Sequence, residues 1–295
     1  MKRKLLFIFN PYSGKRTIKN KLLGIIDVFV KAGFEVTAYP TQGPKDATAK
    51  TIADSGDYDR IVCSGGDGTL DEVITGLIKA GRSIPVGYIP AGSTNDFGKS
   101  LGIPLDMKKA AVISASDNIF SCDIGRINDR TFVYVAAFGI FTETSYLTPQ
   151  SLKNIMGHAA YVMEGFKSLY DITSYAIKVE YDGNTLDDEF IFGMITNSQS
   201  VGGFKGLTGK DVRLDDGLFE VTLIKKPKNP IELNEIMASL TTLIDDSDMI
   251  LTFKTNRIKM SFLNKASWTL DGEFGGLIDE ADIECIHKGI SILRR

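Results

Sequence analysis

The sequence predicts two domains: an N-terminal α/β domain, with a parallel sheet and helices on both of its faces, and a C-terminal β-sandwich domain. The first ~115 residues alternate strand-like and helix-like patterns, which is typical of a parallel α/β unit. From about residue 118 the segments become aromatic and β-branched, with hairpin signals between them. We therefore expect domains at residues 1–120 and 121–285, with residues 286–295 as candidates for completing the first domain.

The N-terminal half supports this interpretation element by element. Residues 4–10 form an apolar run typical of a buried strand, and apolar residues recur at helical spacing across residues 17–32. Gly33 then provides a helix stop. The remaining predicted strands are residues 34–39, 60–63 and 85–89, and the remaining predicted helices are residues 46–53, 70–80, 95–101 and 105–114.

The C-terminal half has the pattern of antiparallel strands. Strands at residues 175–181 and 189–196 flank an Asp-Gly turn, and strands at residues 123–127 and 131–136 flank Asn128-Asp129. Further strands are predicted at residues 218–224, 249–255, 257–262 and 266–270, and helices at residues 149–169 and 230–242. A β-rich domain of this kind is expected to pack as a sandwich.

Composition limits the function. The chain has 295 residues and a net charge of −3, which gives no support for bulk binding of nucleic acid. Cys63, Cys122 and Cys285 are widely spaced, which argues against a disulfide framework or a zinc site and suits a reducing cytosol. The apolar run at residues 5–9 is too short for a signal-peptide core or a membrane span, so we expect neither.

Three polar or glycine-rich loops follow predicted strands. In an open parallel sheet, ligands bind at the edge where the strands end. The loops are Asn10-Pro11-Tyr12-Ser13-Gly14-Lys15, Ser64-Gly65-Gly66-Asp67-Gly68-Thr69 and Pro90-Ala91-Gly92-Ser93-Thr94-Asn95-Asp96-Phe97. Each offers backbone N–H groups or hydroxyls just before a helix, as an anion-binding loop does.

The second loop carries the strongest signal. Three glycines in four positions let the backbone approach a phosphate chain where a Cβ would clash. Asp67 would repel phosphate unless it binds Mg²⁺ or accepts hydrogen bonds from the ligand, so it is a functional candidate. The alternative for Asp67 is a tight turn with an aspartate cap. The first loop, taken alone, is equally consistent with a turn capped by Ser13, and the third with a helix N-cap.

Two acidic clusters lie in the second half, Asp215-Asp216-Gly217 and Leu270-Asp271-Gly272-Glu273. Asp-Gly is common in hairpin turns, which is the simpler interpretation of both clusters. Phosphoryl transfer to an alcohol, however, needs a carboxylate near the hydroxyl proton, and Mg²⁺ needs oxygen ligands. These clusters are the best source of both outside the glycine-rich loops.

Taken together, the three loops and two acidic clusters resemble the diacylglycerol kinase family of bacterial soluble lipid kinases, of the diacylglycerol kinase B type. Their order and spacing cover almost the whole chain, although Gly-Gly-Asp-Gly-Thr alone is shared with NAD kinases. The resemblance implies an NAD kinase/diacylglycerol kinase-like α/β domain, a C-terminal β-sandwich and an active site between them. It also implies a Mg²⁺- and ATP-dependent transferase of phospholipid biosynthesis that converts diacylglycerol to phosphatidic acid.

The resemblance also implies site residues. Asp271 or Glu273 would be the general base, and Mg²⁺ would be held by Asp216 with the main-chain carbonyls of Arg213 and Leu218. Lys15 would be a phosphate partner as a point charge. The residues implied to bind ATP are Asn10, Pro11, Tyr12, Ser13, Gly14, Thr41, Gly65, Gly66, Asp67, Gly68, Thr69, Leu70, Asp71, Glu72, Ser93 and Thr94.

One position departs from the family's pattern. The family's second loop usually continues with Asn, where this chain has Asp71. An amide both donates and accepts hydrogen bonds, whereas an ionised carboxylate only accepts and adds negative charge near phosphate. This substitution puts the nucleotide contact at position 71 in doubt.

Two other functions remain open from the sequence: an NAD kinase-like phosphotransferase and a non-catalytic nucleotide-binding protein. The first loop, the third loop and the Asp271 cluster fit the lipid kinases better than the NAD kinases. Expected partners are a lipid alcohol and the membrane surface, with a homodimer possible for this family and no nucleic acid. We therefore expect a cytoplasmic protein, peripheral at the inner membrane surface, whose Lys153, Lys167, Lys225, Lys226 and Lys228 are candidates for contacting headgroups.

Overall fold

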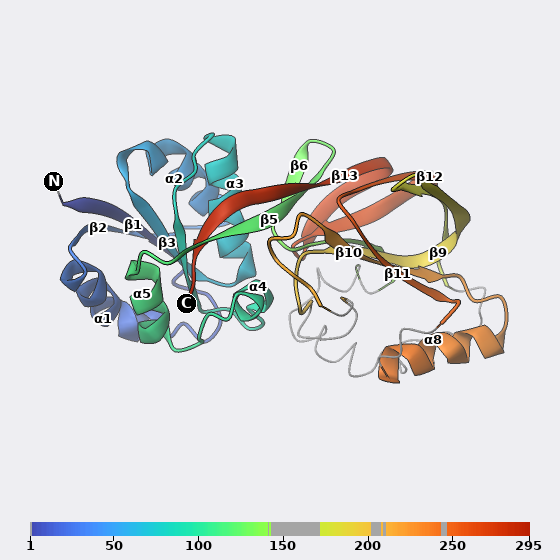
Figure 1. Cartoon of the computed structure of the whole chain (residues 1–295). Coiled ribbons are helices and arrows are strands. Elements are labelled where there is room, and N and C mark those ends of the chain that lie inside the picture. The colour runs from blue at the N-terminus through green and yellow to red at the C-terminus, as the bar shows by residue number, and fades with distance from the viewer. Residues whose placement is uncertain (1, 141, 143–171, 202–207, 209–210, 243–246) are drawn as a thin grey trace. The chain divides into compact units, whose positions relative to one another are not determined.

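The computed structural model describes residues 2–140, 142, 172–201, 208, 211–242 and 247–295. The predicted helix at residues 149–169, with Lys153 and Lys167, lies outside them. Within the described residues, no helix is both long enough and apolar enough to cross a membrane. The chain divides into two compact units, residues 1–122 with 288–295 and residues 123–287, which we call unit 1 and unit 2. Figure 1 labels their elements.

Unit 1 is an α/β unit. Its elements are β1 (Arg3–Phe9), α1 (Ile18–Lys31), β2 (Phe34–Pro40), α2 (Asp46–Asp54), a 3-10 turn (Ser55–Asp57), β3 (Arg60–Gly65), α3 (Asp67–Lys79), β4 (Val86–Pro90), α4 (Asp96–Ser100) and α5 (Met107–Ala115). The strands pair in parallel in the order β4-β3-β1-β2. Helices α1 and α5 cover one face of this sheet, and α2 and α3 cover the other (Figure 1).

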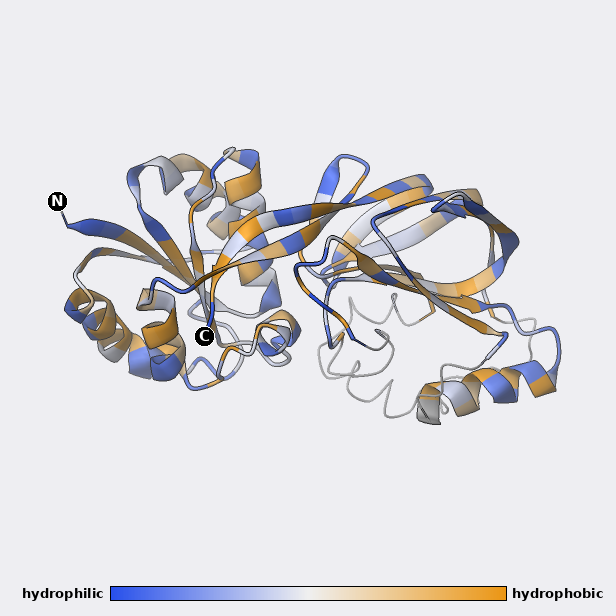
Figure 2. Ribbon diagram, in the orientation of Figure 1, coloured by the Kyte–Doolittle hydropathy of each residue, from blue (hydrophilic) through white to orange (hydrophobic). Residues whose placement is uncertain are grey.

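The apolar pattern explains these elements. Strands β3 and β4 are buried along their whole length, as expected for a parallel sheet covered on both faces. Helix α1 buries Ile18, Ile25 and Phe29 on one face, and Gly33 adopts a φ of 90° just after its end, where a glycine is favoured. Hydrophobic and hydrophilic residues alternate in bands along α1 and α5 (Figure 2), which is typical of amphipathic helices.

Unit 2 is built mostly from antiparallel strands. Its elements are most of β5 (Ile119–Ile127), β6 (Arg130–Phe132), β7 (Val135–Gly139), β8 (Tyr175–Tyr181), β9 (Asn184–Thr196), β10 (Phe219–Lys225), α8 (Pro230–Thr242), β11 (Ile250–Thr255), β12 (Arg257–Leu270) and most of β13 (Glu273–Leu293). The long strands β9 and β12 each pair with both β7 and β8, so they bend and take part in two portions of the sheet.

The end of β13 belongs to unit 1, where Ile292 pairs in parallel with Val86 of β4. The sequence suggested only a short final segment, whereas β13 runs for 21 residues. Most of β13 was not predicted because residues 279–288 are largely polar. A strand with one face exposed to solvent needs few apolar residues.

The predicted strand at residues 131–136 is wrong in one respect. It is interrupted, because β6 ends at Phe132 and β7 begins at Val135. The N–H groups of Val133, Tyr134 and Val135 donate to the carboxylate of Asp271 instead of to the backbone of a neighbouring strand. Because these three consecutive N–H groups bind a side chain, they are not available for β-sheet hydrogen bonds, and the strand is interrupted there.

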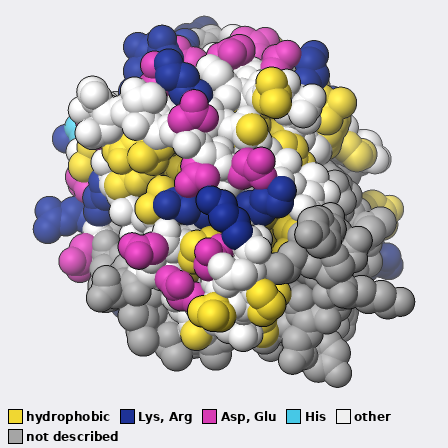
Figure 3. All heavy atoms as spheres, turned by 90° about the vertical axis from the view of Figure 1, so that its right-hand side faces the viewer, with side chains coloured by type: hydrophobic (Ala, Val, Ile, Leu, Met, Phe, Trp, Pro, Cys, Tyr) yellow, Lys and Arg dark blue, Asp and Glu magenta, His cyan; other side chains and the backbone are white. Residues whose placement is uncertain are grey.

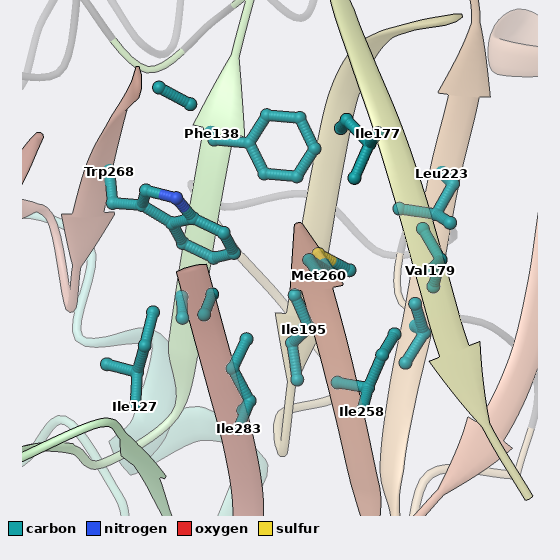
Figure 4. Close-up of a cluster of buried hydrophobic side chains, with 14 of the residues drawn as sticks. Ile127, Phe138, Ile177, Val179, Ile195, Leu223, Ile258, Met260, Trp268 and Ile283 are labelled. Atoms are coloured by element: carbon teal, nitrogen blue, oxygen red, sulfur yellow. The ribbon is translucent and has the colours of Figure 1, made fainter. Parts of the chain in front are cut away.

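A cluster of buried aromatic and aliphatic side chains forms the core of unit 2 (Figure 4). Phe138 of β7 and Trp268 of β12 lie at its centre, with ring centroids 5.0 Å apart, and Phe262 stands edge-on to Phe138 at the same distance. Gly193 of β9 has no Cβ, and a Cβ there would overlap the Phe138 ring. The core therefore depends on the fit of Phe138 against its neighbours.

We expect Phe138→Ala to lower the free energy of unfolding by about 3–5 kcal/mol, because it removes a fully buried ring and leaves a cavity. Leu263→Ala is the matched control, since Leu263 is 79% exposed and its truncation should change stability by less than about 0.5 kcal/mol. Urea denaturation of both variants measures the difference. Equal stabilities would contradict the assignment of the core.

Candidate active site

Three loops of unit 1 lie at one edge of its sheet. They follow β1, β3 and β4, which are mutually parallel neighbours, so their carboxyl ends point the same way. We call residues 10–15 the first loop, residues 64–69 the second loop and residues 90–97 the third loop. The edge at which they meet is where open α/β sheets bind ligands.

Backbone hydrogen bonds hold the third loop against the second. The N–H groups of Ala91 and Gly92 donate to the carbonyl oxygen of Gly65 over 2.7 and 3.2 Å. The two backbones come so close that a Cβ on Gly92 would lie 2.5 Å from the Cα of Gly66. Glycine at position 92 is therefore a requirement of the contact between the loops.

The first loop joins the same contact. The N–H of Asn10 donates to the carbonyl of Ser64 over 2.8 Å, and the Asn10 side chain accepts the N–H of Tyr12 over 2.9 Å. Gly14 has a φ of 50°, and a Cβ there would overlap the carbonyl oxygen of Ala91. The structure thus brings the three glycine-containing segments together, as their positions after parallel strands predict.

Two buried residues lock the third loop. The Asn95 side chain accepts the N–H of Gly92 and donates to its carbonyl, both over 2.9 Å, while its own φ is 52°. The Tyr88 hydroxyl lies 3.1 Å from Asn95 Oδ1 and 3.2 Å from the carbonyl of Gly65, so it bridges the second and third loops. Burial raises the pKa of Tyr88 well above its usual value, so the hydroxyl keeps its proton.

The carboxylate of Asp67 points to the start of α4. It accepts the N–H of Asp96 over 3.0 Å, the N–H of Phe97 over 3.3 Å and the hydroxyl of Thr94 over 3.4 Å. These bonds compensate the unsatisfied amides at a helix N-terminus. Asp67 therefore positions the third loop from the second, a role that the sequence pattern did not distinguish from direct ligand binding.

The remaining predicted nucleotide residues lie just after β2, on α3 and in the loops. Thr41 follows β2, and its N–H donates to the carbonyl of Phe9 over 2.9 Å, next to the first loop. Ser93 and Lys15 are exposed, whereas Thr69 is buried and packs where a Cβ on Gly65 would lie. Helix α3 begins directly at the second loop, so its N-terminus lies at this edge, and the N–H groups of Thr69 and Leu70 donate to the carbonyl of Gly66 over 3.1 and 3.3 Å.

In unit 2, Asp271 and Gly272 form the turn between β12 and β13. Their φ values of 51° and 86° are those of a two-residue hairpin turn, and Leu270 pairs with Glu273 across it. The Asp271 carboxylate accepts the N–H groups of Val133, Tyr134 and Val135 over 2.6–3.0 Å. The hairpin interpretation of this cluster is confirmed, and the carboxylate itself also fixes the β6–β7 segment.

Glu273 differs from Asp271 in its surroundings. Asp271 is 7% exposed, whereas Glu273 is exposed and makes no side-chain hydrogen bond or ion pair with any residue that the structure describes. The two candidate bases thus lie two residues apart in one hairpin, and Asp271 is held by hydrogen bonds whereas Glu273 is open to solvent.

The second acidic cluster lies just before β10. Asp216 accepts the N–H of Leu218 over 3.2 Å, and its other oxygen lies 3.8 Å from Lys254 Nζ. Lys254 also pairs with the buried Glu220 over 3.0 Å. Burial raises the pKa of Glu220 to about 7, Lys254 opposes that rise, and the charge of Asp216 adds to it.

Asp123 is a site residue that sequence reasoning missed. It is fully buried, accepts the N–H of Gly217 over 2.7 Å and lies 2.9 Å from His287 Nδ1. The available signal was an aspartate directly between Cys122 and Ile124 in a predicted strand region. Tyr88 was missed for a similar reason, since its hydroxyl sits in a strand that looks uniformly apolar.

Unit 1 is therefore a parallel α/β unit whose three glycine-containing loops meet at the carboxyl edge of its sheet, which is the arrangement in which open α/β sheets bind phosphate groups. A family model for the diacylglycerol kinase catalytic domain matches residues 4–127. The diacylglycerol kinase of Staphylococcus carnosus is 36% identical over 94% of this chain and 90% of its own length. That of Bacillus subtilis is 36% identical over 92% and 90%.

The chain therefore belongs to the diacylglycerol kinase family, a family of lipid kinases, which confirms the resemblance drawn from its motifs. A crystal structure of a diacylglycerol kinase from Bacillus anthracis strain Sterne has the same fold, with a TM-score of 0.78 at 21% identity. That match covers 100% of this chain and 97% of the other.

The contact between the second and third loops gives a stability prediction. Gly92→Ala should lower the free energy of unfolding by about 1–3 kcal/mol, because its Cβ meets the backbone of Gly66. Gly24→Ala on α1 is the same substitution in open space and should be neutral or stabilising by up to about 1 kcal/mol. Thermal denaturation compares them, and a Gly92→Ala protein as stable as Gly24→Ala would contradict the close approach.

Proposed function

We propose that this protein transfers the γ-phosphoryl group of ATP to the free hydroxyl of diacylglycerol, giving phosphatidic acid and ADP. The hydroxyl oxygen forms the new P–O bond, the bond to the β-phosphate oxygen breaks, and the hydroxyl proton passes to a base. Membership of the diacylglycerol kinase family supports the acceptor. The observation that carries the proposal is the junction of the three loops at the carboxyl edge of the sheet, where Ala91 and Gly92 bind the carbonyl of Gly65 and Asn10 binds that of Ser64.

ATP is proposed to bind at this junction. Backbone N–H groups of the first and second loops and the start of α3 would hold the phosphates, because helix N-termini attract anions. Lys15 would add a positive charge. The proposed nucleotide residues are Asn10, Pro11, Tyr12, Ser13, Gly14, Thr41, Gly65, Gly66, Asp67, Gly68, Thr69, Leu70, Asp71, Glu72, Ser93 and Thr94.

The Asp216 loop suits a magnesium ion by its donor chemistry. A carboxylate and the main-chain carbonyls of Arg213 and Leu218 are oxygen ligands, which Mg²⁺ prefers. Lys254 Nζ lies 3.8 Å from Asp216 and 3.0 Å from Glu220, so a positive charge is already compensated by carboxylates beside this loop. Bound there, Mg²⁺ would supply charge compensation to the loop before β10.

Asp271 or Glu273 is proposed to accept the hydroxyl proton. A carboxylate near an incoming alcohol is what phosphoryl transfer requires, and a strong base is unnecessary when little bond formation precedes transfer. Asp271 offers a fixed carboxylate, and Glu273 offers an exposed one.

A lipid acceptor implies contact with a bilayer surface, so we propose a cytoplasmic protein that is peripheral at the inner membrane surface. Lys225 and Lys226 are weak candidates for that contact, since they lie 3.6 Å from Asp188 and 2.8 Å from Glu189. On the face shown in Figure 3, basic side chains lie among acidic ones rather than alone.

Homodimerisation stays a prediction, and light scattering of the purified protein tests it.

The first test is product identity. With labelled ATP, Mg²⁺ and mixed micelles, we expect label in phosphatidic acid when diacylglycerol is the acceptor. We also expect no NADP when NAD replaces the lipid. Thin-layer chromatography of the lipid phase and chromatography of the aqueous phase separate the products. Label only in NADP would establish the alternative NAD kinase activity, and ATP binding without any transfer would favour a nucleotide-binding protein.

The second test separates the two candidate bases. Asp271→Asn should lower the free energy of unfolding by about 2–4 kcal/mol. The substitution replaces one acceptor oxygen with an NH₂ group, which is a donor and cannot bind the backbone N–H groups that it faces. Glu273→Gln should leave stability unchanged. The kcat of Glu273→Gln at saturating substrates then assigns the base.

A loss of about 100-fold or more in kcat makes Glu273 the proton acceptor. A kcat of Glu273→Gln close to that of the native protein, together with a comparable loss of kcat in folded Asp271→Asn, makes it Asp271. If neither variant changes kcat while both are folded, the proposal of a base in this hairpin is wrong.

A further inference from the structure

The loop between β2 and α2, residues 41–45, shares the edge of the three nucleotide loops. Strand β2 runs parallel to β1, so both end at this edge. Thr41, the proposed nucleotide residue of this loop, donates its N–H to Phe9, which directly precedes the first loop. The conformation of residues 41–45 therefore decides where Thr41 lies relative to a bound nucleotide.

This loop depends on two carboxylates for its shape. Gln42 to Lys45 are exposed, and Lys45 has a φ of 65°, an unfavourable conformation for a residue other than glycine. Asp46 accepts the N–H of Gln42 over 2.7 Å and the hydroxyl of Tyr39. Lys45 is the N-cap residue of α2, and its side chain makes no capping hydrogen bond. The N–H groups at the start of α2 therefore need an acceptor from another part of the chain.

Glu72 supplies that partner from another helix. Its two carboxylate oxygens accept the N–H groups of Lys45 over 2.8 Å and Ala47 over 3.1 Å, one oxygen for each donor. Its own carbonyl accepts the hydroxyl of Thr48 over 2.9 Å. A carboxylate bound to the first amides of a helix is favoured both by the hydrogen bonds and by the helix dipole.

Close packing keeps Glu72 at that position. Helices α2 and α3 lie side by side, and a Cβ on Gly76 of α3 would lie 2.6 Å from the Cβ of Thr51 of α2. Helix α3 begins at the second loop, one turn before Glu72. The bond from Glu72 to residues 45–47 thus ties the β2–α2 loop to the same helix that presents the second loop.

We infer that Glu72 is a positioning residue for the nucleotide: it acts through the β2–α2 loop and Thr41, and its carboxylate does not need to touch ATP. The inference rests on the proposed function for the site itself. Its consequence is specific, because loss of the carboxylate should weaken nucleotide binding while leaving the phosphoryl-transfer step and the lipid site intact. A merely structural role would lower stability alone.

The experiment uses the full chain with Glu72→Gln and Glu72→Ala. Glutamine keeps one oxygen that can accept a hydrogen bond, so it should have the smaller effect. We expect the KM for ATP to rise about threefold for Gln and about tenfold for Ala. We expect kcat within about twofold of the native value and an unchanged KM for diacylglycerol.

Asp54→Asn is the matched control. Asp54 lies at the other end of α2 and pairs with Lys50 over 2.6 Å, so the substitution removes the same charge without touching the β2–α2 loop. It should lower stability slightly and leave the KM for ATP unchanged. A KM for ATP that rises equally in Asp54→Asn and Glu72→Gln, or that stays unchanged in both Glu72 variants, would overturn the inference.

Calorimetric binding of the analogue ATPγS distinguishes this failure from a failure of the proposed function. If the native protein binds ATPγS but does not phosphorylate diacylglycerol, the proposed function fails. The inference then stands or falls on whether the Glu72 variants bind ATPγS more weakly than Asp54→Asn does. Weakened binding confined to the Glu72 variants supports it, and equal binding overturns it.

Discussion

The carbonyl oxygen of Gly65 is the point on which the proposed nucleotide site depends. It accepts the amides of Ala91 and Gly92, which fixes the third loop against the second. Glycine at position 92 follows from this contact, because a Cβ there would overlap the backbone of Gly66. Glycine at position 14 is required separately, because a Cβ there would overlap the carbonyl oxygen of Ala91. The first loop joins the other two separately, because the N–H of Asn10 donates to the carbonyl of Ser64. Together the three loops form one edge lined by backbone amides, which is the arrangement that binds phosphate.

A second physical theme is the use of carboxylates to organise backbone amides. Asp67 holds the start of α4, Glu72 the start of α2, and Asp271 the break between β6 and β7. Asp123 does the same for Gly217. Such bonds are stronger than neutral ones and leave no amide unsatisfied. Acidic residues that look like ligands in the sequence are therefore, in several cases, the supports of the loops around them.

Much of the fold could be predicted from the sequence because its signals are local. The apolar runs of β1, β3 and β4 and the spacing in α1 and α3 predict a parallel α/β unit, and glycines after the strands predict convergent loops. What could not be predicted depends on pairs of residues far apart in the chain. The bond of Asp271 to residues 133–135 breaks a strand that looks continuous, and the length of β13 depends on partners rather than on its own composition. Tyr88 and Asp123 have roles that only their neighbours define.

Hydrogen exchange of the full-length protein with and without Mg-ATP tests the central claim most directly. If the three loops form one nucleotide site, peptides that cover residues 10–15, 65–69 and 91–95 should all exchange more slowly when the nucleotide is added. Peptides from the β8–β9 hairpin, residues 175–196, should be unchanged. Protection of only one of the loops, or protection confined to residues 175–196, would contradict the account.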